Sequence, residues 1–150
     1  MRRSIVLALV AATALGACSR PSSTGRIDFV TAAGRVRTGA VAVADTPSER
    51  EHGLMGVSHL APDDGMVFVF DGPTLSGFWM KDTLIPLSVA FWNGSGTVVD
   101  VLDMQPCTAD PCPVYTPRGS YSTALEMNVG WFHAHGITIG DHAALTRSGS

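Results

Sequence analysis

The chain has 150 residues, a formal net charge of −3 and only 15% charged residues, a length that allows one domain beside a targeting segment. The acidic excess and the dispersed basic residues exclude a nucleic-acid footprint and a polybasic membrane patch. The 16 glycines and 9 prolines favour a strand-rich, turn-rich fold over a helical bundle. We therefore expect one mainly β domain over residues 26–147, a compact antiparallel or mixed β barrel or sandwich with one or two short helices, followed by a tail at 148–150.

The first 18 residues have the layout of an export signal. Two arginines precede an apolar run over residues 5–15, which is too short to span a bilayer. The run ends in Leu-Gly-Ala-Cys18, which resembles the bacterial lipoprotein box and implies that Cys18 becomes the lipidated first residue of the mature chain. A cleaved secretory peptide with an unmodified cysteine is the alternative. Ser19 resembles the pattern of outer-membrane rather than inner-membrane retention, which implies a lipid-anchored domain on the periplasmic side after a polar tether at 19–25.

Apolar runs predict the strands of the domain. The run Met66 to Phe70 is apolar throughout, which predicts a central strand that is buried on both faces. Gly39 indicates a bulge or a point of close backbone approach, and Pro86 indicates an edge, a bulge or a break because it cannot donate to a ladder. The predicted strands cover residues 26–31, 35–44, 66–70, 78–83, 84–92, 97–104, 121–127 and parts of 137–146.

Two short helices are predicted. Thr46 can cap a helix whose first residue is Pro47, because Glu49 occupies the position of a capping-box carboxylate. This helix should run to about Met55 and end at Gly56. A second helical turn is predicted over residues 130–136.

Cys107 and Cys112 flank a loop that is bounded by prolines. In an exported protein such a pair predicts a disulfide, which would stabilise the domain by roughly 2 kcal/mol in the chain-entropy model. Zinc is less favoured, because only two cysteines and no adjacent histidine are offered. A redox-active pair is more often spaced by two residues.

Lys81 is the only lysine of the chain and lies between large hydrophobic residues. A strand over residues 78–83 would place Trp79, Lys81 and Thr83 on one face and Asp82 on the other. Two interpretations stay open for Lys81. Its stem can pack on Trp79 while the ammonium reaches water, or the ammonium is enclosed and needs an acidic partner.

Glu126 is the best candidate for that partner, because it lies on a strand face of small residues where a cleft could open. A Lys81–Glu126 pair could be a structural bridge, the polar floor of a pocket for a small ligand, or a catalytic pair. The predicted ligand-binding residues are Trp79, Lys81, Asp82, Thr83, Ser88 and Glu126.

The function that these residues favour is a small-ligand-binding or adaptor module. An enzyme that acts on a small polar, sugar-like substrate through the Lys/Glu pair is one alternative, although no phosphate-binding glycine loop and no Gly-x-Ser-x-Gly elbow is present. Copper binding is another, through the dispersed methionines or His133, His135 and His142. No cofactor is expected, and the protein partner stays open.

Several segments of the chain are similar to the bacterial and archaeal family called domain of unknown function 192. The similarity covers roughly Val41 to Leu145 and implies a compact, mainly β domain with one short helix, often exported, without an established activity. The family tends to have phenylalanine and arginine at Gly56 and Val57, aspartate at Ser88 and often asparagine at Asp82, so an activity that needs those residues would be altered here. The segments that carry the similarity are Glu49-Arg50, Gly53-Leu-Met55, Gly65 to Phe70, Phe78 to Leu87, Leu125 to Asn128 with Gly130, Gly136-Ile137 and Gly140-Asp141.

Overall fold

One curled sheet contains eight of the ten strands in the computed structural model, which describes residues 23–148. Its hydrogen-bonded order is β10-β1-β3-β4-β9-β6-β7, with β2 beside β1 and a separate pair formed by β5 and β8. Neighbouring strands run antiparallel except β3 and β4, which are parallel. The strands are β1 (Ser23–Thr31), β2 (Gly34–Arg37), β3 (Val41–Ala44), β4 (Gly65–Thr74), β5 (Phe78–Trp79), β6 (Leu87–Trp92), β7 (Val98–Met104), β8 (Val114–Tyr115), β9 (Tyr121–Asn128) and β10 (His142–Arg147), and the helices are α1 (Pro47–His52) and α2 (Trp131–Ala134).

The sheet curls into a half-barrel whose two ends meet in part. An isolated bridge joins Thr97, just before β7, to His142 at the start of β10. Ala143 N–H donates to the carbonyl of Gly96 over 2.7 Å beside this bridge. These bonds satisfy backbone groups that the edge strands would otherwise leave open, and the mainly β architecture that the composition predicts is confirmed.

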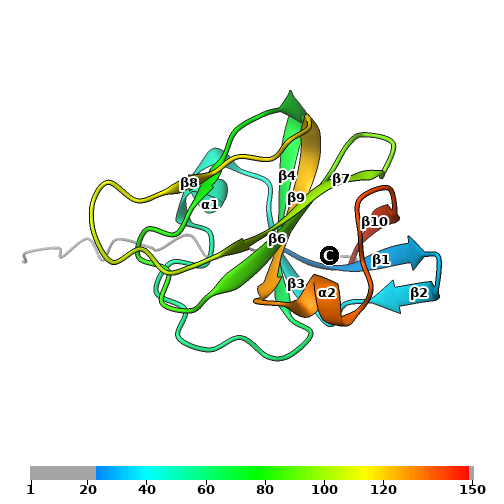
Figure 1. Ribbon diagram of the computed structural model, residues 1–150, viewed down its shortest axis with the longest axis horizontal. Helices are drawn as coiled ribbons and strands as arrows, with labels where there is room; N and C mark the ends of the chain where they lie inside the picture. The colour runs from blue at the N-terminus through cyan, green and yellow to red at the C-terminus, as the bar shows by residue number, and fades with distance from the viewer. Residues whose placement is uncertain (1–22, 149–150) are drawn as a thin grey trace, which may run out of the picture.

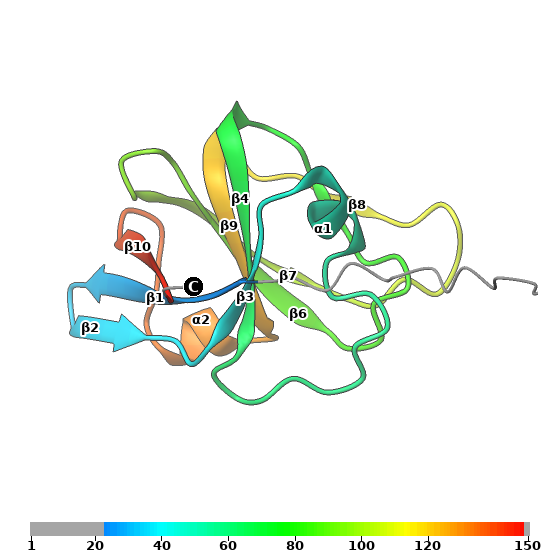
Figure 2. The same ribbon diagram turned by 180° about the vertical axis from the view of Figure 1, so that it is seen from behind.

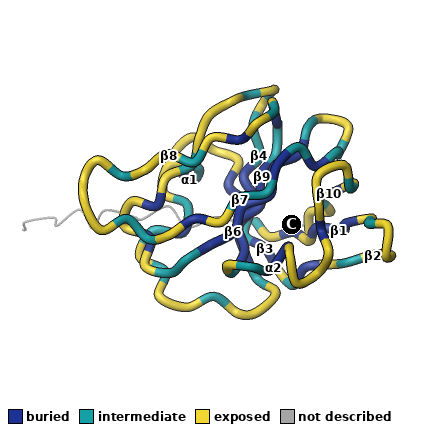
Figure 3. Tube along the Cα trace, viewed as in Figure 1, coloured by how far each residue is buried: buried dark blue, intermediate teal, exposed yellow. Residues whose placement is uncertain are grey.

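Apolar side chains form two clusters on opposite faces of the central strands. The residues of β6 are buried without exception, because Val89 and Phe91 face one cluster while Ala90 and Trp92 face the other. Figures 1 and 2 show α1 and β8 at one end of the molecule and β1, β2, β10 and α2 at the other, with β4, β9 and β6 between them. The buried residues concentrate along these central strands (Figure 3).

The sequence predicted the start of α1 correctly. Thr46 caps α1 through its hydroxyl, which accepts from Glu49 N–H, and the Glu49 carboxylate accepts from Thr46 N–H over 3.1 Å, so the capping box is confirmed. The helix is shorter than predicted and ends at His52, with Gly53 as its C-cap at a φ of 51°. Neither helix in the described residues has the length and hydropathy needed to cross a bilayer.

Two predicted boundaries are wrong for backbone reasons. The segment 35–44 is divided into β2 and β3, because Gly39 approaches a loop so closely that a Cβ would lie 2.9 Å from the carbonyl oxygen of Asp63. Close approach at Gly39 was one of the two roles predicted for it. Residues 23–25, assigned to a tether, belong to β1 and pair with β3. The predicted signal segment and Cys18 lie outside the described residues.

Candidate functional site

The predicted strand over residues 78–83 ends early, which changes where its side chains point. β5 stops at Trp79, and the chain then turns, with Thr83 N–H donating to the carbonyl of Met80 over 3.3 Å. Asp82 has a φ of 53°, in the left-handed region that asparagine and aspartate tolerate better than most residues. The family's frequent asparagine at this position therefore has a backbone explanation. The predicted alternation of faces beyond Trp79 is wrong because the chain is not extended there.

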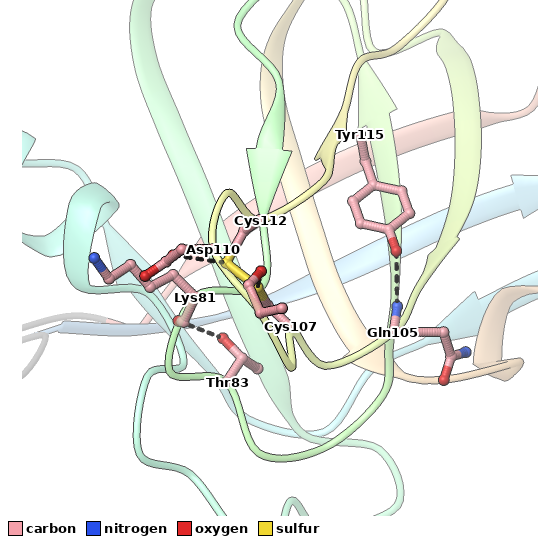
Figure 4. Close-up of a disulfide and its surroundings, with 8 residues drawn as sticks. Lys81, Thr83, Gln105, Cys107, Asp110, Cys112 and Tyr115 are labelled. Carbon is pink, nitrogen blue, oxygen red and sulfur yellow. Dashed lines mark hydrogen bonds between the residues drawn. A yellow bond between two sulfur atoms is a disulfide. The ribbon is translucent and has the colours of Figure 1, made fainter.

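Lys81 and Glu126 are not brought together. Lys81 is exposed in the turn, with its ammonium 5.6 Å from the centroid of the Trp79 ring, and its side chain extends away from the neighbouring disulfide (Figure 4). No ion pair within residues 23–148 includes Lys81 or Glu126. The solvent-reaching lysine, one of the two interpretations, is the one observed, and the Lys81–Glu126 pair is a wrong prediction.

The loop after β7 supports this turn from outside. Cys107 and Cys112 form the predicted disulfide, with an S–S distance of 2.12 Å. Cys107 N–H donates to the carbonyl of Met80 over 3.3 Å, so the disulfide loop lies against the segment that carries Lys81 and Thr83 (Figure 4).

Ser88 lies on the opposite face of the sheet from Glu126. Val89, the cross-strand partner of Glu126, belongs to the cluster on the Glu126 side, and Ser88 is its neighbour on the other face. The Ser88 hydroxyl accepts from Gly130 N–H over 2.7 Å and donates to Asp103. Ser88 thereby holds the start of α2, a structural role that an aspartate could also fill as an acceptor.

A cavity of about 240 Å³ opens between α1 and the sheet face that carries Glu126. Five aromatic side chains line it, from β4, from the segment around β5 and from the start of β9. The lining residues are Arg50, Glu51, His52, Gly53, Leu54, Met55, Phe68, Phe70, Ser76, Gly77, Phe78, Trp79, Thr83, Tyr121 and Glu126. Trp79, Thr83 and Glu126 of the predicted set therefore share one cavity.

Lys81 and Asp82 line an adjoining recess instead. This recess shares Trp79, Glu51, His52 and Met55 with the cavity, so the two lie side by side next to α1. Five of the six predicted ligand-binding residues thus line one or the other of these two adjacent recesses, and Ser88 lines neither.

Glu126 is the chemically unusual residue of the cavity. It is only 4% exposed, and its carboxyl group has no hydrogen-bond or ion-pair partner among the described residues. Its neighbours in the adjacent strands are Met66 and Val89. This apolar burial raises the pKa of Glu126 to about 8, because a carboxylate loses its hydration there without compensation. The carboxyl group is therefore largely protonated at neutral pH and can either donate or accept.

Two other polar groups of the cavity wall, on Arg50 and Tyr121, are already engaged. The Arg50 guanidinium donates to the carbonyls of Asp45 and Val69 over 2.6 and 2.8 Å and lies 5.1 Å from the Phe70 ring centroid. The Tyr121 hydroxyl donates to the carbonyl of Ser76 over 2.7 Å, and burial raises its pKa. These contacts fix two walls of the cavity. The remaining titratable residues of the lining are Glu126 in the sheet and Glu51 and His52, which are exposed on α1.

Sequence reasoning missed Arg50, His52, Phe68, Phe70 and Tyr121 as cavity residues. The family similarity includes Glu49-Arg50 and Gly65 to Phe70, but only the packing of α1 beside β4 shows that these segments share a wall.

The methionine and histidine residues do not gather into a site. Met66, Met80, Met104 and Met127 are buried in the two apolar clusters, where thioethers fill core space. The described residues contain no group of three or more histidine, cysteine, aspartate or glutamate side chains that could hold a metal ion.

The fold and the cavity define a mainly β half-barrel domain with a small acidic and aromatic pocket beside its first helix. Residues 29–145 match the model of the DUF192 family, described as uncharacterized ACR. The chain therefore belongs to this family of unknown function, and the similarity predicted from its motifs is confirmed.

Two solved structures share the fold. A protein of Sinorhizobium meliloti 1021, described as a "putative transcription regulator", is 31% identical, with a TM-score of 0.74 over 81% of this chain and 93% of that chain. A protein of unknown function from Novosphingobium aromaticivorans DSM 12444 is 26% identical, with a TM-score of 0.74 over 90% of this chain and 99% of that chain. No curated protein matches the chain.

Proposed function

We propose that this protein is an exported, lipid-anchored domain that binds a small molecule in the cavity beside α1. The observation that carries the proposal is the Glu126 carboxyl group, which has no partner among the described residues and opens into a cavity lined by five aromatic side chains. Binding pockets combine apolar walls with a few polar groups that orient the ligand, and a ligand would supply the hydrogen bond that Glu126 lacks.

The compartment in this proposal rests on the lipoprotein box at Cys18 and on the Cys107–Cys112 disulfide, because disulfides persist in oxidising compartments. The enzyme alternative that uses a Lys81–Glu126 pair loses its basis, because the two side chains do not meet. Copper binding through the methionines has little support, since four of their thioethers pack in the core.

Native mass spectrometry of the full chain, purified from its own membrane in mild detergent, tests the proposal. We expect a retained mass that is lost in Ser76→Trp, which obstructs the cavity wall at an exposed position. Leu75→Trp is the matched control, because Leu75 is 60% exposed and lies outside the lining. The proposal would be overturned if no mass were retained and if no fragment in an NMR screen changed the chemical shifts of the cavity residues.

A further inference from the structure

We infer that the ligand of this cavity is a small organic cation, whose ammonium group is received by Glu126 while its apolar body lies against the aromatic walls. The inference rests on the proposed function and adds the chemical class of the ligand.

The buried carboxyl groups of the described residues provide the first argument. Three such residues are buried, and two of them are fully engaged. Asp100 accepts from Arg118 N–H over 2.9 Å and pairs with its guanidinium over 3.2 Å. Glu49 accepts from the Thr46 hydroxyl and backbone over 2.8 and 3.1 Å. Glu126 alone among these three has no partner within residues 23–148, and its carboxyl group opens into the cavity, where a bound ligand can contact it.

The local positive charges cannot fill that role. Arg50 is held by two carbonyl groups and by the Phe70 ring, and Lys81, the only lysine, lies outside the cavity. His52 lines the cavity but is exposed on α1 and forms no ion pair with Glu126. A charge-assisted hydrogen bond is roughly twice as strong as a neutral one. An ammonium group therefore compensates the buried carboxylate better than a hydroxyl or an amide does.

The walls suit such a group as well. Phe68, Phe78 and Tyr121 line the cavity without a cation from the described residues over their rings, whereas Phe70 and Trp79 already face Arg50 and Lys81. Aromatic rings attract cations, more strongly when the cation is desolvated. A volume of about 240 Å³ corresponds to roughly eight water volumes of ~30 Å³. The ligand is thus of the size of a short alkylamine and much smaller than a nucleotide.

Protonation gives this interaction a pH signature. An ammonium group binds the carboxylate form of Glu126, so binding below the pKa of Glu126, about 8, must release its proton. The observed affinity should then rise about tenfold per pH unit up to about pH 8 and level off above it. A neutral ligand that accepts from the protonated acid would instead bind with constant affinity below about pH 8 and lose about tenfold per pH unit above it.

Isothermal titration of the full chain in nonionic detergent tests the inference, with n-butylammonium, 1-butanol and butyrate as probes. We expect butylammonium to bind at least tenfold more tightly than butanol at pH 8, and butyrate not to bind. Glu126→Gln should remove both the preference and the pH dependence, whereas Asp71→Asn, the same carboxyl-to-amide change at an exposed position outside the lining, should keep both.

Equal or tighter binding of butanol, or pH-independent binding of butylammonium, would overturn the inference that the ligand is a cation. The proposed binding site would still stand if Ser76→Trp blocks binding of the same probe. Absence of binding by all three probes would also overturn the inference that the ligand is a cation. A retained mass in the native spectrum would then support the proposed small-molecule binding independently of the ligand class.

Discussion

Glu126 of β9 and Val89 of β6 are cross-strand partners, and both side chains lie on the face of the sheet that borders the cavity beside α1. An acid is thus placed next to an aliphatic side chain in a fully paired central sheet. The backbone of β9 is paired on both sides at Glu126, with β4 and with β6. The strand therefore cannot shift its register locally to turn the carboxyl group out to water.

This placement predicts a pH-dependent stability. An unfolded glutamate has a pKa near 4.3, whereas folded Glu126 titrates at about 8, so the folded state retains a proton that the unfolded state loses between these values. The free energy of unfolding contributed by Glu126 is intact below about pH 4.3 and should fall by roughly 1.4 kcal/mol per pH unit up to about 8. Urea unfolding of the wild type and Glu126→Gln at pH 5, 7 and 9 measures it. As the pH rises, the free energy of unfolding of the wild type should fall relative to that of Glu126→Gln. Parallel pH profiles of the two proteins would refute the raised pKa of Glu126.

Lys81→Met should change the free energy of unfolding by less than about 1 kcal/mol, because an exposed ammonium above a Trp ring contributes only ~0.5–1 kcal/mol. Arg118→Met is the contrasting variant, since it strips side-chain donors from the buried carboxylate of Asp100 and should cost more than about 1 kcal/mol. Chemical denaturation of both variants provides the comparison. A loss at Lys81 as large as that at Arg118 would mean that the lysine has a structural partner after all.

Thr46→Ala should destabilise the domain by about 1 kcal/mol, because the N-terminus of α1 loses the hydroxyl that accepts from Glu49 N–H. Thr46→Ser keeps this acceptor and should lose little stability. Thermal and urea unfolding of the two variants separate these expectations. If alanine and serine were equally stable, the capping box would not anchor α1.

Cys18→Ala should abolish labelling of the full chain by a radioactive fatty acid in its host cell, because the lipoprotein-box cysteine is the predicted acylation site. The double variant Cys107→Ser/Cys112→Ser should keep the label while losing the disulfide. Fluorography of the immunoprecipitated chain is the readout. Label that persists after Cys18→Ala would exclude this cysteine as the anchor.

The sequence by itself determined the features that depend on neighbours along the chain. The capping box of Thr46 and Glu49, the central strand at Met66 to Phe70 and the Cys107–Cys112 disulfide all follow from short-range chemistry, and the structure contains each of them. A strand break was one of the three roles left open for Pro86, and β6 begins directly after this residue. The family similarity over the folded part was likewise carried by short motifs and is matched over residues 29–145.

Only the tertiary structure decided which distant residues share a site. The alternation of a strand places Ser88 and Val89 on opposite faces of β6, but it cannot show that Glu126 lies on the Val89 side, because that depends on the register between β6 and β9. Nor could it show that the chain turns at Asp82, which sends Lys81 into solvent. The partner of a buried charge is set by strand pairing and by backbone turns far apart in the sequence, and a one-residue difference in either reverses the face on which a side chain lies.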